Sequence, residues 1–167
     1  DLTANITGVT KAQRGIQLLG QRKQVLIQDE IVHPTPTTCW WFAHYINTGT
    51  TVTIGADPTT VTLTSGTERL WGKIVSGGTA WTVRTARPLP TSPNPAEAYT
   101  NDTYSKLAIQ LSNVTNTTLA VWFVPLAPGE VAPTTLPTIT ALNTWDLAAQ
   151  NEAPTVQNSG ANSVGGA

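Results

Sequence analysis

The stretch Gln24–Val32 reads Gln-Val-Leu-Ile-Gln-Asp-Glu-Ile-Val and indicates the fold most clearly. Val25, Ile27 and Ile31 alternate with other residues and share one strand face with Asp29, a pattern typical of a β-strand with one face toward a core. A second apolar run, Thr38–Asn47, follows shortly afterwards. We therefore expect two strands here, both contributing side chains to a buried layer.

The rest of the chain continues this pattern of short apolar runs, and no segment has the periodicity of a convincing amphipathic helix. Gly20–Lys23, Asn47–Gly49 and Ser76–Gly78 supply residues suited to tight turns between neighbouring strands. The other expected strands are Arg14–Leu19, Thr51–Ile54, Val61–Leu63, Glu68–Ser76, Ala80–Thr85, Lys106–Ser112 and Thr118–Pro125, with Leu136–Trp145 as a candidate last strand. The regular spacing predicts an all-β fold, an antiparallel β-sandwich.

Domain organisation follows from where this pattern ends. We expect residues 1–149 to form the β-sandwich domain, which a preceding chain could complete. The proline-rich segment Arg87–Asn101 is predicted to be a long surface loop. Residues 150–167 are mostly small and polar, which predicts a flexible polar tail.

Charge and composition exclude several classes of partner. Charged residues make up only 11% of the 167 residues, and the formal net charge is −1. We therefore expect no nucleic-acid partner and no general attraction to anionic lipid. No apolar stretch approaches the roughly 20 residues of a membrane-spanning helix, so no membrane span is expected.

Four Asn-x-Ser/Thr motifs, at Asn5, Asn101, Asn113 and Asn116, indicate a secreted or extracellular glycoprotein. Asn113 and Asn116 are so close that one glycan would hinder the other. The chain contains no Met, begins at Asp1 and shows no signal peptide, a pattern that fits either proteolytic processing or a cleaved tag.

Few residues have the chemistry of a catalytic or metal site. His33 and His44 are separated by 11 residues, which matches no common zinc motif, and we expect neither a metal nor a cofactor. Cys39 is the single cysteine and lies in an apolar run, so a buried thiol is expected. Asp29 lies on the apolar face of its strand. It is either a general acid or base or a carboxylate held by an arginine such as Arg14, whereas Glu30 points to the opposite face.

Six tryptophans suggest a carbohydrate-binding surface, because aromatic rings stack on sugars and guanidinium groups bind carboxylates or sulfates. The alternative is a structural role for each of them. We expect Trp40, Trp41 and Trp122 to lie in the core or at an interface. The candidate carbohydrate-binding residues are Trp71, Lys73, Trp81, Arg84 and His44.

The segments Asp1–Ala4, Lys11–Ile16 and Gln24–Ile31 together resemble part of the β-domain of heparinase II/III-like polysaccharide lyases. In that family an Asp-Leu-Thr opening, an Arg-Gly strand and a Val-Leu-Ile-Gln-Asp-Glu strand follow one another. The resemblance covers about the first 32 residues well. Trp41, the segment 71–74 and the closing Leu142-Asn143-Thr144-Trp145 fit it loosely.

The resemblance implies an α/α-toroid domain before the β-sandwich and cleavage of uronic-acid-containing polysaccharides by β-elimination. The family's catalytic Tyr and His residues lie largely upstream of the matching segment, so no catalytic residue is transferred to this chain. Three hypotheses remain. The chain is a β-sandwich subunit of a secreted lyase held to an N-terminal catalytic chain of the same precursor, a domain that binds acidic polysaccharide, or a structural cell-surface domain.

Overall fold

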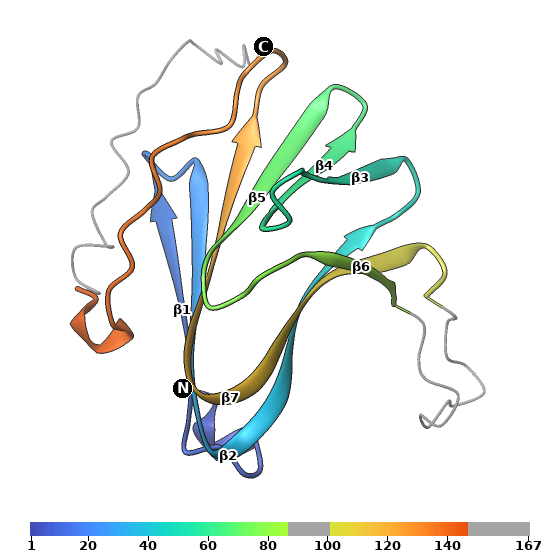
Figure 1. The fold of residues 1–167 in the computed structure, drawn as a ribbon. Helices are drawn as coiled ribbons and strands as arrows, with labels where there is room; N and C mark the ends of the chain where they lie inside the picture. The colour runs from blue at the N-terminus through green and yellow to red at the C-terminus, as the bar shows by residue number, and fades with distance from the viewer. Residues whose placement is uncertain (87–100, 147–167) are drawn as a thin grey trace, which may run out of the picture.

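The computed structural model describes residues 1–86 and 101–146. Its regular elements are η1 (Thr3–Asn5), β1 (Lys11–Leu19), β2 (Gln24–Ile46), β3 (Thr50–Ile54), β4 (Thr60–Ser65), β5 (Glu68–Ser76), β6 (Thr82–Thr85), β7 (Tyr104–Leu126) and η2 (Leu142–Thr144). Every strand pairing is antiparallel, which confirms the predicted all-β class (Figure 1). The predicted tail over 150–167 and most of the Arg87–Asn101 loop lie outside the described residues.

The seven described strands form one sheet in the order β1-β2-β7-β5-β4-β3, with β6 paired to the start of β7. The sequence predicts one strand before and one after residues 33–37, and likewise before and after residues 113–117. In the structure each of these pairs is a single continuous strand, β2 or β7, and the two strands bend together. The register shifts between Val32 and Thr37, where Pro34 and Pro36 have no backbone N–H to donate. Asn113 on the facing strand has a φ of 56°.

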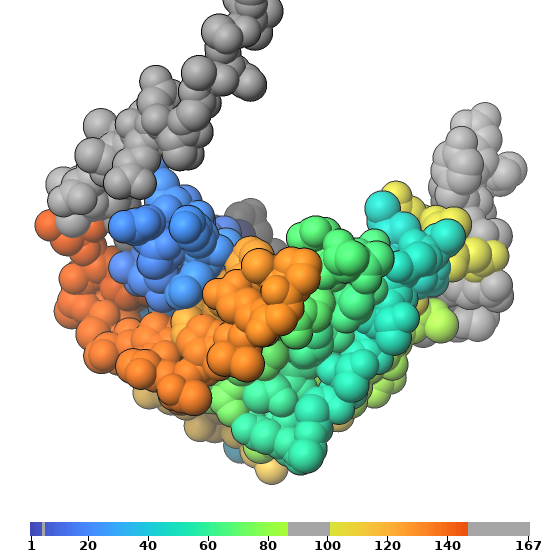
Figure 2. Space-filling view, turned by 90° about the horizontal axis from the view of Figure 1, so that it is seen from above, coloured from blue at the N-terminus to red at the C-terminus, as the bar shows by residue number. Residues whose placement is uncertain are grey.

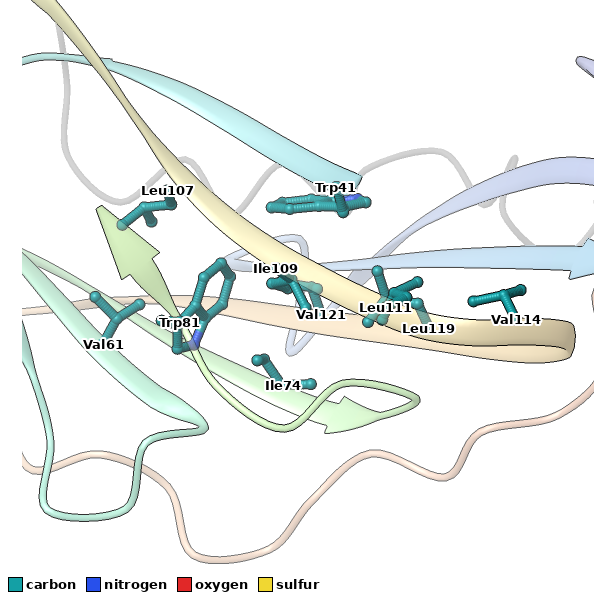
Figure 3. Close-up of a cluster of buried hydrophobic side chains, with 10 residues drawn as sticks. All are labelled: Trp41, Val61, Ile74, Trp81, Leu107, Ile109, Leu111, Val114, Leu119 and Val121. Atoms are coloured by element: carbon teal, nitrogen blue, oxygen red, sulfur yellow. The ribbon is translucent and has the colours of Figure 1, made fainter. Parts of the chain in front are cut away.

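The bend divides the sheet into two layers that pack against each other. The proximal layer contains β1, β3, β4, β5 and the parts of β2 and β7 beside β1 and β5 (24–32 and 116–126). The distal layer contains β6 with the other halves of β2 and β7 (39–46 and 104–111). The core between them joins Trp41, Leu107 and Ile109 of the distal layer to Ile74 and Val121 of the proximal layer (Figure 3).

Residues 127–146, the C-terminal strap, cross the opposite face of the proximal layer (Figure 1). The predicted strand Leu136–Trp145 is wrong: this segment is irregular and contains η2. Its backbone is held by side chains of β2, because Gln28 Nε2 donates to the Thr140 carbonyl at 2.7 Å and the Leu142 N–H donates to Glu30 at 2.6 Å. A second apolar cluster lies between the strap and this side of the sheet, which faces away from the main core.

The distal layer covers only part of the proximal layer, which leaves an open trough. The described part of the chain is V-shaped, with β1 in one arm and β3 and the start of β7 in the other (Figure 2). Ile16 and Leu18 lie on the core-facing side of β1 beside Ile27, yet remain 58% and 52% exposed. The described helices are three-residue 3-10 turns, none of which is long or apolar enough to cross a bilayer.

Candidate functional site

Trp71 and Trp81 are structural residues, and the prediction that they present sugar-binding rings is wrong. Trp81 is 2% exposed, packs edge-on against Trp41 with ring centroids 5.9 Å apart and donates its indole N–H to the Thr59 carbonyl at 2.9 Å. Trp71 is 9% exposed and packs edge-on against Trp122 at 5.6 Å. Neither ring has a free face on which a sugar could stack.

Lys73 is also engaged within the protein. Its ammonium lies 2.6 Å from the Asp57 carboxylate, in the loop before β4. The hydrogen bond from Lys73, together with those from Thr59, holds the pKa of the exposed Asp57 carboxyl well below its usual range. Lys73 therefore ties β5 to this loop and does not join the other predicted sugar-binding residues.

Arg84 and His44, in contrast, lie on one surface, the outer side of the distal layer. Trp40 and Phe42 belong to the same surface, with ring centroids 6.0 Å apart and planes within 6° of parallel. The Arg84 guanidinium lies 4.3 Å from the centre of the Trp40 ring, and the Lys106 ammonium lies 4.5 Å from that of Phe42. We call Trp40, Phe42, His44, Arg84 and Lys106 the aromatic-cationic face.

Strand register explains how these residues come together. Lys106 of β7 is the direct partner of His44 on one side and of Arg84 on the other. Side chains alternate along β2, so the exposed residues Trp40, Phe42 and His44 face outward while Trp41 packs in the core. The alternation was visible in the sequence, but it did not show which of the two faces is buried, and no sequence signal identified Lys106.

Asp29 has the structural role that was predicted as one of two alternatives. The Arg14 guanidinium makes two hydrogen bonds to its carboxylate, at 2.6 and 2.7 Å, across the β1–β2 pair. The Asp29 carboxylate raises the pKa of Arg14 above its ordinary value, against the opposing effect of burial. This pair lines a cavity of about 300 Å³ together with Cys39 and Trp41, whose indole N–H is buried without a partner among the described residues.

Glu30 points to the other face, as predicted, and contacts the C-terminal strap. Burial disfavours its ionised form, but hydrogen bonds from the Lys11 ammonium and the Leu142 N–H outweigh burial and lower the pKa of Glu30. Burial raises the pKa of the Cys39 thiol, which makes it a weaker nucleophile at neutral pH. His33 lies at the bend, hydrogen-bonded to Thr35, away from His44 near the end of β2.

No metal site is formed by the part of the chain that the structure describes, since no three His, Cys, Asp or Glu side chains gather there. Asn101, Asn113 and Asn116 of the glycosylation motifs have exposed side chains, as attachment of a glycan would require. The side chain of Asn5 lies outside the described part.

No model of a known protein family matches this chain, and no curated protein shows significant sequence similarity to it. The two surfaces that remain as candidate functional sites, the open trough and the aromatic-cationic face, are therefore interpreted from their own residues and contacts.

Proposed function

We propose that this chain is the β-domain part of a secreted heparinase II/III-like polysaccharide lyase, held without covalent links to a chain of the same precursor that carries most of the catalytic groups. Its glycosylation motifs are in keeping with secretion. The reaction proposed for the assembled protein is cleavage of a uronic-acid-containing polysaccharide by β-elimination.

The observation that carries this proposal is the way in which the resembling segments meet in space. Arg14 and Asp29, from the Arg-Gly and Gln-Asp-Glu segments, form the partly buried ion pair between β1 and β2. A Cβ added to Gly15 would meet Leu142 and lie 2.8 Å from Trp145 of the closing segment. These segments are far apart in the sequence and in side-chain contact in the fold, and this contact supports interpreting them together as one unit of the proposed β-domain.

The chemistry of β-elimination explains why a second chain is needed. The reaction requires a base for the proton at C5 and a group that neutralises the uronate carboxylate. In the described residues, His44 lies beside Lys106 and Arg84, but on the exposed outer side of the distal layer, and the Arg14 guanidinium is already paired with Asp29. We place the active site on the partner chain, because the family's catalytic residues lie largely upstream of the resembling segments.

The open trough is where we place that partner. Ile16 and Leu18 on β1 leave apolar surface exposed beside the partly buried Ile27, and β1 is an edge strand of the sheet. An extended segment of the catalytic chain that pairs with β1 and turns apolar side chains inward would cover both residues.

A pull-down from the source organism tests the trough. We expect Ile16→Glu and Leu18→Glu, introduced into the tagged chain, to lower recovery of the companion chain by at least about tenfold, because each would place a carboxylate in a buried apolar contact. The companion is identified from its peptides as a toroid-containing chain.

Val131→Glu is the matched control, because Val131 is 82% exposed in the strap and away from β1. All three variants should retain the thermal unfolding midpoint of the isolated chain, since the substituted side chains are exposed there. Undiminished recovery with both trough variants, or the same loss with Val131→Glu, would contradict docking at β1.

A further inference from the structure

We propose that the aromatic-cationic face is a non-catalytic binding site for a polyuronate, a polysaccharide that carries a carboxylate on each sugar ring. The inference goes beyond the lyase proposal and does not rest on it, because the site lies on the outer side of the distal layer and needs no second chain.

The aromatic residues give this face its affinity for sugar rings. Trp40 and Phe42 are 37% and 38% exposed although they are large and apolar, and their rings are nearly parallel. Two parallel rings on one strand form a rigid apolar surface that loses little side-chain entropy when a ligand binds. The C–H faces of pyranose rings fit such a surface.

The charges determine which sugars bind. Arg84, Lys106 and His44 occupy directly facing positions on β6, β7 and β2, so three basic side chains form a row across neighbouring strands. Strands are about 4.8 Å apart, which gives the row a length of roughly 10 Å. Successive rings of a pyranose chain repeat at a comparable spacing, so one carboxylate per ring can match one basic residue per strand.

Arg84 and Lys106 have no carboxylate partner within the described part of the protein. Its salt bridges join Lys11 to Glu30, Arg14 to Asp29 and Lys73 to Asp57. The three strand segments that build the distal layer, 39–46, 82–85 and 104–111, contain no Asp or Glu at all. Arg84 and Lys106 are instead held against aromatic rings, which orients them without neutralising their charge.

The same features favour a carboxylated polysaccharide over other anions. The chain as a whole has a net charge of −1, so this face is not part of the extended basic surface that is typical of a nucleic-acid-binding protein. Heavily sulfated chains carry several charges per disaccharide, and a single row of basic residues would leave most of them unpaired. One charge per sugar ring suits the row of basic residues, and the partly exposed Trp40 and Phe42 suit the apolar faces of the sugar rings.

Electrophoresis of the isolated chain through gels that contain polygalacturonate, heparin or neutral hydroxyethyl cellulose tests the proposal. We expect polygalacturonate to retard the chain most strongly, in a manner that decreases with added salt. Arg84→Gln should raise the dissociation constant by at least about tenfold, as expected for loss of a hydrogen bond to a charged group. Phe42→Ala should raise it by about three- to tenfold.

Two substitutions elsewhere serve as matched controls. Lys23→Gln removes one exposed positive charge in the β1–β2 turn, and Leu136→Ala removes one exposed apolar side chain in the strap. Neither should change retardation. Equal retardation by heparin or by the neutral polymer, an equal loss in Lys23→Gln, or no retardation at all would overturn the proposal. Because the assay contains no companion chain, its result stands whether or not the lyase proposal holds.

Discussion

Trp81→Ala should lower the free energy of unfolding by about 3–5 kcal/mol, the usual loss when a buried tryptophan is removed from a core. Trp81 precedes β6 and fills the space between the layers, against Trp41 at 5.9 Å and Phe123 at 6.1 Å. The substitution would leave a cavity there and free the Thr59 carbonyl of its indole partner. A loss of this size is a large part of the total stability of a typical domain.

Denaturant unfolding followed by circular dichroism measures this loss, and Trp40→Ala is the matched control. Trp40 is partly exposed on the aromatic-cationic face, so its removal should cost about 1 kcal/mol or less. Trp40→Ala should weaken polygalacturonate binding directly, whereas Trp81→Ala should not. Equal destabilisation by both substitutions would contradict the assignment of Trp81 to the core and Trp40 to the surface.

Arg14→Ala should destabilise the fold by about 3 kcal/mol, because it would leave a buried carboxylate without its cation. The Asp29 side chain is 10% exposed, whereas that of Arg14 is 42% exposed. Asp29→Ala should therefore cost less, about 1–2 kcal/mol, since the unpaired guanidinium can turn toward water. The two substitutions are thus expected to lower the free energy of unfolding by unequal amounts.

A double-mutant cycle in the same unfolding assay measures the interaction energy between Arg14 and Asp29, apart from the contacts that each makes with other residues. The Arg14→Ala/Asp29→Ala variant should be more stable than Arg14→Ala alone, because no charge remains buried. Lys23→Ala, which removes an exposed cation from the turn after β1, should leave stability unchanged. An Asp29→Ala variant as unstable as Arg14→Ala, or more so, would show that the carboxylate is not the group that depends on the pair.

Local sequence patterns predicted the strands well and the way they connect less well. Period-two alternation identified Glu68–Ser76 with the bounds that the structure has. The same alternation could not show that β2 continues through Pro34 and Pro36, because prolines usually end a strand and here they lie at a bend where ladder hydrogen bonds are interrupted anyway. Leu136–Trp145 in the C-terminal strap was predicted as a last strand, but this irregular segment pairs with none of the described strands.

For the candidate site residues too, the sequence predicted local features but not the contacts between distant segments. Local sequence placed Asp29 on an apolar face and suggested Arg14 as its partner, since a buried carboxylate needs a cation. The sequence grouped Trp71 and Trp81 with nearby basic residues. It could not show that both are buried, because the bend in β2 and β7 decides which strand faces the other layer covers. Lys106 joins Arg84 and His44 only through strand pairing between distant segments.

The most direct test of the proposed lyase assembly is native mass spectrometry of the protein purified from its source, followed by denaturing mass measurement and peptide identification of every chain. We expect a noncovalent complex in which this chain, with heterogeneous glycan masses, accompanies a larger chain that contains a toroid lyase sequence. A single glycosylated chain with no companion would contradict the proposed assembly, and sugar binding at the aromatic-cationic face would then be the function left to explain the protein.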